Sequence, residues 1–357
     1  MLKKLSLAAL VAMGSMSVAS ATDLSSAIKG VDLKGFLRLR AYHDAGTGAT
    51  HETRWRTTAA FNFAVPVTDE LKFHEDFAYN WNMYDDASTA GSATPLNTHM
   101  FLDFSKNGAN VLVGKIPVVT PVTGSGVGEA LGAGVLATYK LNDSLTFAAA
   151  GLDTLANTTP VAVGGNNTYA AAAIYKSDMA DVNVWAFEVD GIINYDYVVS
   201  ADVKALKDMG VTLHVDYADA DLDGQAHKNT YKNISATYSK DAVCAKVGFA
   251  ANGQNGGTVV LDTDAPIAAV FATEQITGIA DGTKGDKAIY AKVGYKVDAK
   301  LNPYVAYTKA DDAGTEALVG AKYAYTKKFG VQVYYSVLSK DDNKGNREAR
   351  AEFKYKF

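Results

Sequence analysis

The 357-residue sequence has a single cysteine, Cys244. One cysteine forms neither an intrachain disulfide framework nor a thiolate metal site. Beyond the N-terminal segment the chain also lacks any run of eighteen consecutive apolar residues, which excludes a membrane-spanning helix. Proline is scarce, with seven residues, whereas tyrosine (20) and glycine (31) are abundant. Tyrosine and phenylalanine at alternating positions, separated by Asn, Asp and Gly turns, are typical of a large antiparallel sheet.

The N-terminal segment has the layout of a secretory signal peptide. Lys3 and Lys4 form a positive region, residues 5–18 are largely apolar, and residues 19–21 read Ala-Ser-Ala, an A-x-A cleavage site. A membrane anchor is the alternative, but the segment is too short and too rich in Ser and Gly. We therefore expect residues 1–21 to be a signal peptide and residues 22–357 to form one domain.

The charge and the histidine spacing exclude two further classes of protein. The net charge of −5 becomes −7 once Lys3 and Lys4 leave with the signal peptide, so no nucleic-acid partner is expected. The six histidines show neither H-x-x-x-H nor HExxH spacing. His214 and Asp216 share a strand face, but a lone histidine on a polar face is more often an ordinary polar residue. We expect no enzymatic activity.

The C-terminal residues alternate strictly between an apolar and a charged face, which is the period of a β-strand between two environments. In a secreted chain, an amphipathic last strand ending in Phe resembles the terminal strand of outer-membrane barrels, which the assembly machinery reads. We expect Phe357 to face outward, on a strand paired with residues 33–41. The apolar face carries Ala349, Ala351, Phe353, Tyr355 and Phe357, and the charged face carries Glu348, Arg350, Glu352, Lys354 and Lys356.

The same alternation recurs along the chain and predicts an all-β protein, a transmembrane antiparallel β-barrel of eighteen strands, with sixteen as the alternative count. A soluble secreted all-β protein is the alternative class. The strands are expected near residues 31–42, 52–65, 71–83, 97–105, 110–117, 133–141, 144–153, 168–176, 182–190, 192–204, 211–219, 229–240, 242–251, 287–297, 301–309, 315–326, 330–339 and 347–357.

The connections between these segments favour the membrane barrel. Short turns alternate with longer loops, as in barrels with short periplasmic turns and longer external loops. A sheet in lipid must close, because an open edge would leave backbone donors unpaired in hydrocarbon. Eighteen strands enclose an aqueous channel, so charged residues can occupy the inner face.

The six arginines of the chain fall on three strands that become neighbours when the barrel closes. Five of them share the polar faces of the first, second and last strands. We expect these five to form a basic wall lining the pore, and charges scattered along a hydrated lumen are the alternative. The five are Arg38, Arg40, Arg54, Arg56 and Arg350.

Two loops could carry further function. The third external loop, about residues 117–132, is rich in glycine, and Glu129 is its only acid. If it folds inward it narrows the pore and sets Glu129 opposite the arginines; a surface loop is the alternative. Asp219, Asp221, Asp223 and Gly224 form D-x-D-x-D-G, a spacing suited to Ca²⁺, but Thr230 stands where an EF-hand has its bidentate Glu. A solvated acidic loop is the alternative there.

Three stretches resemble the major outer-membrane porins of epsilonproteobacteria (Campylobacter-type). They are DLSSAIKGVDLKGFLRLR at residues 23–40, VLVGKIPVV at 111–119 and VVLDTDAPIAAVFATEQITG at 259–278. The resemblance implies an eighteen-stranded, cation-preferring, homotrimeric porin with its third external loop in the pore. It also implies a lumenal Ca²⁺ site built from carboxylates, for which Glu129, Asp153 and Glu274 stand in comparable segments.

These observations together predict a porin in the outer membrane of a Gram-negative bacterium. Its water-filled channel would pass ions and small hydrophilic solutes passively, with weak cation preference. A non-enzymatic structural or adhesive barrel, and a substrate-specific channel, are the alternatives. No cofactor is required, with Ca²⁺ as the one candidate. The expected partners are membrane lipid, lipopolysaccharide, the barrel assembly machinery and two further copies of the chain.

Overall fold

The structure is a computed structural model that describes residues 30–46, 49–85, 93–124, 131–156, 158, 160–280, 282–340 and 343–357. The expected signal peptide, residues 1–21, and Glu129 lie outside the described residues. In the part that is described, no helix has the length and apolar character needed to cross a membrane.

Strands make up most of the described chain, in segments that agree with the sequence pattern. The elements are β1 (Asp32–Gly46), β2 (Ala49–Pro66), β3 (Leu71–Asp85), β4 (Ala93–Lys106), β5 (Ala109–Pro117), β6 (Leu131–Lys140), β7 (Leu145–Ala156), β8 (Thr168–Lys176), β9 (Ala180–Val189), β10 (Ile193–Val203), the 3₁₀ turn η1 (Lys207–Met209), β11 (Val211–Leu222), β12 (Asn229–Lys240), β13 (Val243–Asn252), β14 (Lys287–Tyr295), β15 (Leu301–Ala310), β16 (Gly314–Ala324), β17 (Phe329–Lys340) and β18 (Asn343–Lys356).

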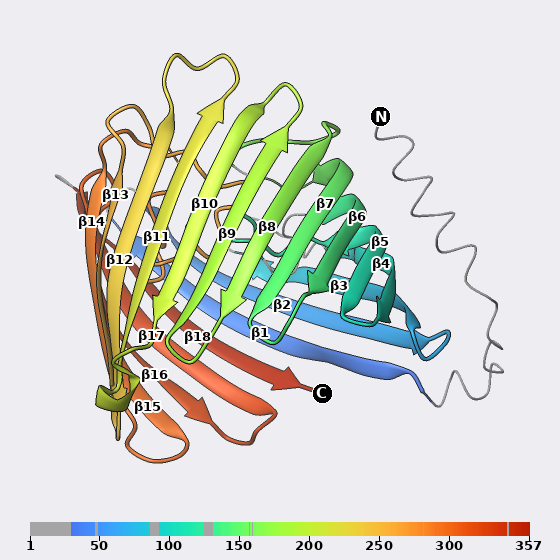
Figure 1. The fold of residues 1–357 in the computed structure, drawn as a ribbon. Helices are drawn as coiled ribbons and strands as arrows, with labels where there is room; N and C mark the ends of the chain where they lie inside the picture. The colour runs from blue at the N-terminus through green and yellow to red at the C-terminus, as the bar shows by residue number, and fades with distance from the viewer. Residues whose placement is uncertain are drawn as a thin grey trace.

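The eighteen strands form one closed antiparallel sheet. Each strand pairs with the next along the chain, and β18 pairs with β1 with Leu37 opposite Tyr355. Figure 1 shows this closure, with β18 in red beside β1 in blue. The backbone N–H of Phe357 donates to the carbonyl of Gly35 at 3.2 Å. The predicted barrel and the pairing of the chain's two ends are therefore confirmed, with eighteen strands and not sixteen.

Alternate residues of each strand face opposite environments. The outward positions carry exposed apolar side chains such as Leu37 (46% exposed), Val305 (54%) and Val319 (56%). The neighbouring inward positions include Ala306, which is 6% exposed, and Leu318, which is 4% exposed. This alternation follows from the pleat, because a barrel in lipid needs an apolar exterior while its interior meets water and inserted loops.

The connections differ between the two ends of the barrel. All the long connections, such as 118–130, 157–167 and 253–286, lie at one end, here called the loop end. That end also has connections as short as turns, including 190–192 and 311–313, so the expected length alternation holds only in part. The other end, here called the turn end, has only short connections, and in outer-membrane barrels such turns face the periplasm.

One turn shows how a side chain ends a strand at the turn end. The carboxylate of Asp298 accepts the backbone N–H groups of Leu301 and Lys300, each at 2.7 Å. These two hydrogen bonds hold the pKa of Asp298 below its ordinary value. Asp298 thus caps the β14–β15 turn in the way that Asx turns are stabilised.

Candidate functional site: a lumen narrowed by an inward-folded loop

The connection between β13 and β14 is residues 253–286, here called the lumen loop, and its described residues 253–280 and 282–286 fold into the barrel. Val259, Leu261, Ile267 and Ile279 of this loop are each at most 2% exposed and belong to the main buried cluster. The core of the molecule therefore lies where this loop packs against inward-facing side chains of the strands. The lumen of this barrel is wide enough to hold the loop, and the hydrophobic effect favours burying its apolar side chains there.

The lumen loop is held first by the connection that follows β5. The N–H of Leu261 donates to the carbonyl of Val122 at 2.9 Å, and the N–H of Ile267 donates to that of Pro121 at 3.3 Å. The N–H of Gly124 donates to the Asp262 carboxylate at 3.3 Å. Residues 118–124 are thus folded inward with the lumen loop, whereas residues 125–130, with Glu129, lie outside the described part.

The second attachment is a buried carboxylate on the wall. Glu316 on β16 is 0% exposed and accepts the backbone N–H groups of Glu274 (3.2 Å), Gln275 (2.9 Å) and Ile276 (2.8 Å). Hydrogen bonds to an ionised acceptor are the stronger kind, and three of them on one carboxylate fix the loop backbone. Two side-chain bonds add to this attachment, Thr273 to Thr308 at 2.7 Å and Gln275 to Ser336 at 2.6 Å.

This attachment carries Glu274 to the wall at β18. The Glu274 carboxylate forms an ion pair with Arg350 at 2.9 Å. The guanidinium of Arg350 also lies over the ring of Tyr334, at 4.4 Å from its centroid. The lumen loop therefore reaches from the β5–β6 connection to β16–β18 and crosses the lumen. The sequence left open whether residues 117–132 fold inward or form a surface loop. In the structure residues 118–124 of that connection fold inward, and the longer late loop folds in with them.

The structure places the five predicted arginines on adjacent strands. Arg40 lies opposite Arg56 in the β1–β2 register, and Tyr42 lies between Arg54 on β2 and Arg350 on β18. These residues share the inward face, because Leu37 on β1 and Trp55 on β2 are exposed on the outward face. We call this group the arginine wall, which consists of Arg38, Arg40, Arg54, Arg56 and Arg350.

Carboxylates and one aromatic ring relieve the repulsion within the arginine wall. Arg40 pairs with Glu352 at 2.5 Å, Arg54 pairs with Asp44, and Arg350 pairs with Glu274. The ring of Tyr42, which is 8% exposed, has three guanidinium groups within 6 Å of its centroid, those of Arg54, Arg56 and Arg350. Such contacts lower the cost of gathering cations.

Two arginines keep uncompensated charge. Within the described residues, Arg38 and Arg56 have no carboxylate ion pair within 4 Å. Arg38 donates to the Thr58 hydroxyl at 3.1 Å and lies opposite Lys354 on β18. Arg38 and Arg56 are therefore the two cations of the arginine wall without a direct carboxylate partner among the described residues.

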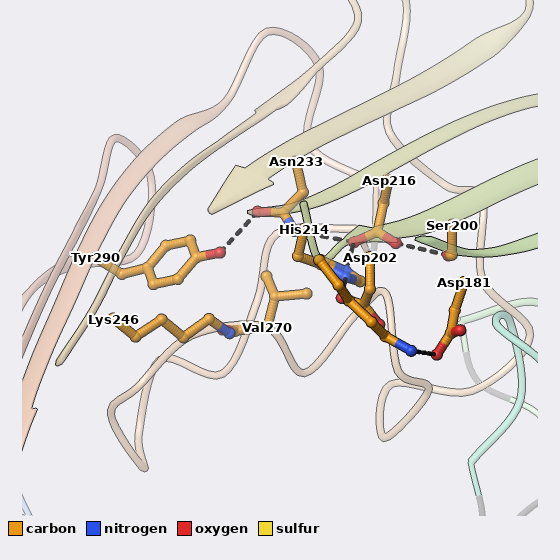
Figure 2. A network of polar contacts seen from close by, with 10 residues as sticks. Asp181, Ser200, Asp202, His214, Asp216, Asn233, Lys246, Val270 and Tyr290 are labelled. Carbon is orange, nitrogen blue, oxygen red and sulfur yellow. Dashed lines mark hydrogen bonds and ion pairs between the residues drawn. The ribbon is translucent and has the colours of Figure 1, made fainter. Parts of the chain in front are cut away.

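A carboxylate-rich cluster lies on the opposite side of the barrel. β10 is nine strands from β1 in either direction around the ring. Here the side chains of β10, β11 and β12 meet in a hydrogen-bonded network, shown in Figure 2. We call it the His214 cluster, which consists of Ser200, Asp202, His214, Asp216 and Asn233. The sequence had placed His214 and Asp216 on one face, and strand register adds the other members.

The expected calcium ligands are not brought together in the described part of the chain. Asp153 is exposed at an irregularity of the β6–β7 register, whereas Glu274 pairs with Arg350 in the lumen. No group of three or more His, Cys, Asp or Glu suited to a metal ion occurs among the described residues. Because Glu129 is outside them, the lumenal Ca²⁺ site stays a prediction.

The D-x-D-x-D-G segment lies on β11 and in the loop after it. Asp219 and Asp221 pair in register with Tyr197 and Tyr195 of β10. These positions alternate with the buried Ala218 and Ala220, so both carboxylates lie on the outward face. Cys244, by contrast, is partly buried on β13 and has no bonded sulfur partner.

Comparison with known proteins gives a consistent result. A family model described as "Campylobacter major outer membrane protein" matches residues 1–357. Among solved structures, the chain resembles Acinetobacter baumannii OccAB1 with a TM-score of 0.75 at 13% identity, covering 96% of this chain and 99% of that chain. Pseudomonas aeruginosa OccK1 (OpdK) gives a TM-score of 0.75 at 11% identity, with coverages of 92% and 99%.

A further structure, Pseudomonas aeruginosa OpdK with vanillate, gives a TM-score of 0.72 at 12% identity and covers 92% of this chain and 99% of that chain. No curated protein sequence matches the chain. At these identities, the likeness to solved structures establishes the barrel fold alone.

Proposed function

Because the chain belongs to the Campylobacter major outer membrane protein family, whose members are outer-membrane porins, we propose that it conducts ions and small hydrophilic solutes by passive diffusion with weak cation preference. The family and the barrel locate it in the outer membrane of a Gram-negative bacterium. Porin barrels are typically not enzymes. The observation that carries the proposal is the arginine wall, five cationic side chains on the inward face of β1, β2 and β18.

The two charged walls support transport of polar solutes. The arginine wall on β1, β2 and β18 faces the His214 cluster across the ring. Charged side chains of one sign are costly in an apolar interior, so their presence supports a hydrated path beside the lumen loop. The opposed charges would create a transverse field that orients dipolar solutes as they pass.

The weak cation preference follows from the balance of these charges. Three of the five arginines of the wall are already paired with carboxylates, which leaves Arg38 and Arg56 as its free cations. Asp311 and Asp312 lie in a connection at the loop end, where carboxylates concentrate cations near the mouth. Salt screens such a field beyond roughly 10 Å at 0.1 M, so the preference should be weak and should fade as salt rises.

The test is the reversal potential of the purified protein in planar bilayers under a KCl gradient. We expect a small potential of cation-selective sign at low salt that approaches zero as both solutions become concentrated. Anion selectivity at low salt would contradict the proposal. A protein that inserts but does not conduct would favour the alternative of a structural or adhesive barrel. The inward fold of the longest loop argues against that alternative, because this loop is then not displayed outside.

The remaining expectations belong to the same proposal. Residues 1–21 would direct export, and the assembly machinery would read β18 and its terminal Phe357. Lipid and lipopolysaccharide would contact the apolar exterior, and three copies would assemble into a homotrimer. Chemical cross-linking of the protein in native membranes tests the last point, since a trimer should give a ladder that ends at three chains.

A further inference from the structure

A cavity of about 300 Å³ lies between the barrel wall and the inward-folded segments. Strands β8 to β11 form its wall, and Pro121 and Pro266 come from the two folded connections that cover it. Its side chains Ile174, Asn183 and Asp202 come within a few residues of the short turns, so the cavity belongs to the half of the lumen nearer the turn end. Its size is at the lower limit of small-molecule binding sites.

One face of the cavity is polar and tightly organised. The Asp216 carboxylate is 1% exposed and accepts the Ser200 hydroxyl at 2.6 Å and the Asn233 amide at 2.9 Å. The His214 ring lies between two carboxylates, with Nε2 at 2.9 Å from Asp216 and Nδ1 at 2.8 Å from Asp202. Figure 2 shows these side chains converging from neighbouring strands.

The hydrogen-bond pattern leaves this face rich in acceptors. Each ring nitrogen of His214 lies within hydrogen-bond distance of a carboxylate, and both donate when the ring is an imidazolium, whose charge then balances one of the two carboxylates. The Ser200 hydroxyl donates to Asp216, so the donors of the cluster are used within it. The Asp202 side chain, by contrast, is 46% exposed and borders the cavity. A ligand entering here therefore meets a half-exposed carboxylate. This arrangement suits a group that donates hydrogen bonds and carries positive charge.

The other face of the cavity is apolar and includes an indole. Trp185 is 6% exposed and lines the cavity, and its ring stacks on Phe187 with centroids 5.5 Å apart. This stacking fixes the orientation of the indole. Tryptophan is the side chain that attracts cations best through its ring, and Ile174 with the two prolines supplies surface for a compact apolar group.

We propose that this cavity binds a small organic ammonium ion, with the ammonium group at Asp202 and the apolar part against Trp185. A carboxylate ligand is disfavoured because the cluster holds two carboxylates, Asp202 and Asp216, and only one imidazole between them to balance their charge. Such a site goes beyond passive diffusion, because it would hold organic ammonium ions in the half of the lumen nearer the turn end. It does not depend on the selectivity of the pore for salt ions.

The experiment measures equilibrium binding to the purified full-length protein in detergent, with benzylamine as the probe. Benzyl alcohol and benzoate are the matched neutral and anionic probes of similar size. We expect benzylamine to bind in the millimolar range or tighter, benzyl alcohol to bind roughly tenfold more weakly, and benzoate to show no binding. Equal binding of benzoate and benzylamine, or no binding of benzylamine at all, would overturn the proposal.

Two variants locate the binding. Asp202→Asn keeps an oxygen acceptor for His214 and removes the charge, and it should weaken benzylamine binding by roughly tenfold. Asp181→Asn is the matched control, because Asp181 lies on the neighbouring strand and pairs with Lys204 at 2.6 Å without lining the cavity. Unchanged affinity in Asp202→Asn, or equal losses in both variants, would refute the assignment.

A third variant keeps the proposal testable if Asp202→Asn does not fold. Val119 borders the cavity and is 52% exposed, so Val119→Phe should narrow the cavity without removing a charge or a core residue. We expect benzylamine binding to fall severalfold in this variant. Unchanged binding there would place the probe elsewhere. Because binding is measured without a membrane or a salt gradient, failure here leaves the reversal-potential test of the pore unaffected.

Discussion

Replacing Glu316 by alanine should release the lumen loop from the wall while leaving the barrel intact. The buried carboxylate of Glu316 accepts three backbone N–H groups of the loop. A hydrogen bond to a charged group contributes about 1.5–3 kcal/mol, so the three together could hold roughly 5 kcal/mol or more. Water entering the vacated space would offset part of this. A net loss of about 3 kcal/mol would raise the population of the detached loop roughly a hundredfold.

Single-channel recording is the assay for this change. The Glu316→Ala protein should show larger mean conductance and more open-channel noise than the unaltered protein, because the loop no longer holds one fixed position. Asp196→Asn is the control, since Asp196 is also a buried lumenal acidic side chain, 1% exposed, but lies on β10. Altered electrophoretic mobility on heating reports whether both barrels are folded. If folded Glu316→Ala conducts like the unaltered protein, this carboxylate does not hold the constriction.

Three further predictions concern the wall, the closure and one turn. Replacing Arg38 and Arg54 together by glutamine should increase cation preference in reversal-potential measurements. The double variant loses the unpaired Arg38, and the loss of Arg54 frees the Asp44 carboxylate. Unchanged selectivity would place both side chains away from the narrowest part of the pore. Gly35→Val should reduce the yield of folded barrel on gels. A Cβ at Gly35 would lie 2.1 Å from a β2 carbonyl oxygen and 2.7 Å from the Phe357 ring, and such overpacking costs about 1–3 kcal/mol. A normal yield would contradict the close contact of Gly35 with Phe357 where β1 meets β18. The pKa of Asp298 is lowered, so its ionised form stabilises the turn at pH values above the unfolded-state pKa of about 3.9. This stabilisation is lost as the pH falls through the lower pKa of the folded state. NMR titration should therefore show the turn amides shifting only below roughly pH 4, and a shift near neutral pH would refute the prediction.

The strands could be read from the sequence because each lies between lipid and lumen. Residues 347–357 alternate between apolar and charged side chains, and the structure places them in β18 beside β1. The same physical requirement acts on every strand of a membrane barrel, which is why the strand count followed from pattern alone. The adjacency of the arginines likewise followed from closure, since the first and last strands must meet.

The arrangement inside the lumen could not be read in the same way. Nothing in the sequence connects Glu316 with the backbone of residues 274–276, because those contacts use N–H groups that every residue possesses. The apolar residues of the lumen loop, such as Leu261 and Ile267, were a signal that this connection does not face water, but they follow no period. Loops that pack against a wall are fixed by tertiary contacts, and pattern reasoning detects only repeating environments.

The His214 cluster could be predicted from the sequence only in part. His214 and Asp216 are two residues apart on β11 and therefore share a face, which the sequence established. Ser200 and Asp202 join them only through the β10–β11 register, in which Ser200 lies opposite Asp216 and Asp202 opposite His214. A shift of one residue would turn the β10 side chains to the outer face. Register was thus the missing information, and the hairpin connection determines it.

The attachment of the lumen loop makes the width of the channel independent of the circumference of the barrel, whereas in a barrel without an inserted loop the two are set together. The sheet of eighteen strands sets the circumference that lipid must surround, whereas the loop sets the calibre available to a solute. Because the loop is held by contacts with inward-facing groups such as Glu316 and by its own buried apolar side chains, substitutions within residues 253–286 can change permeability without altering the lipid-facing surface. The protein can therefore vary what it admits while its fit to the membrane is conserved.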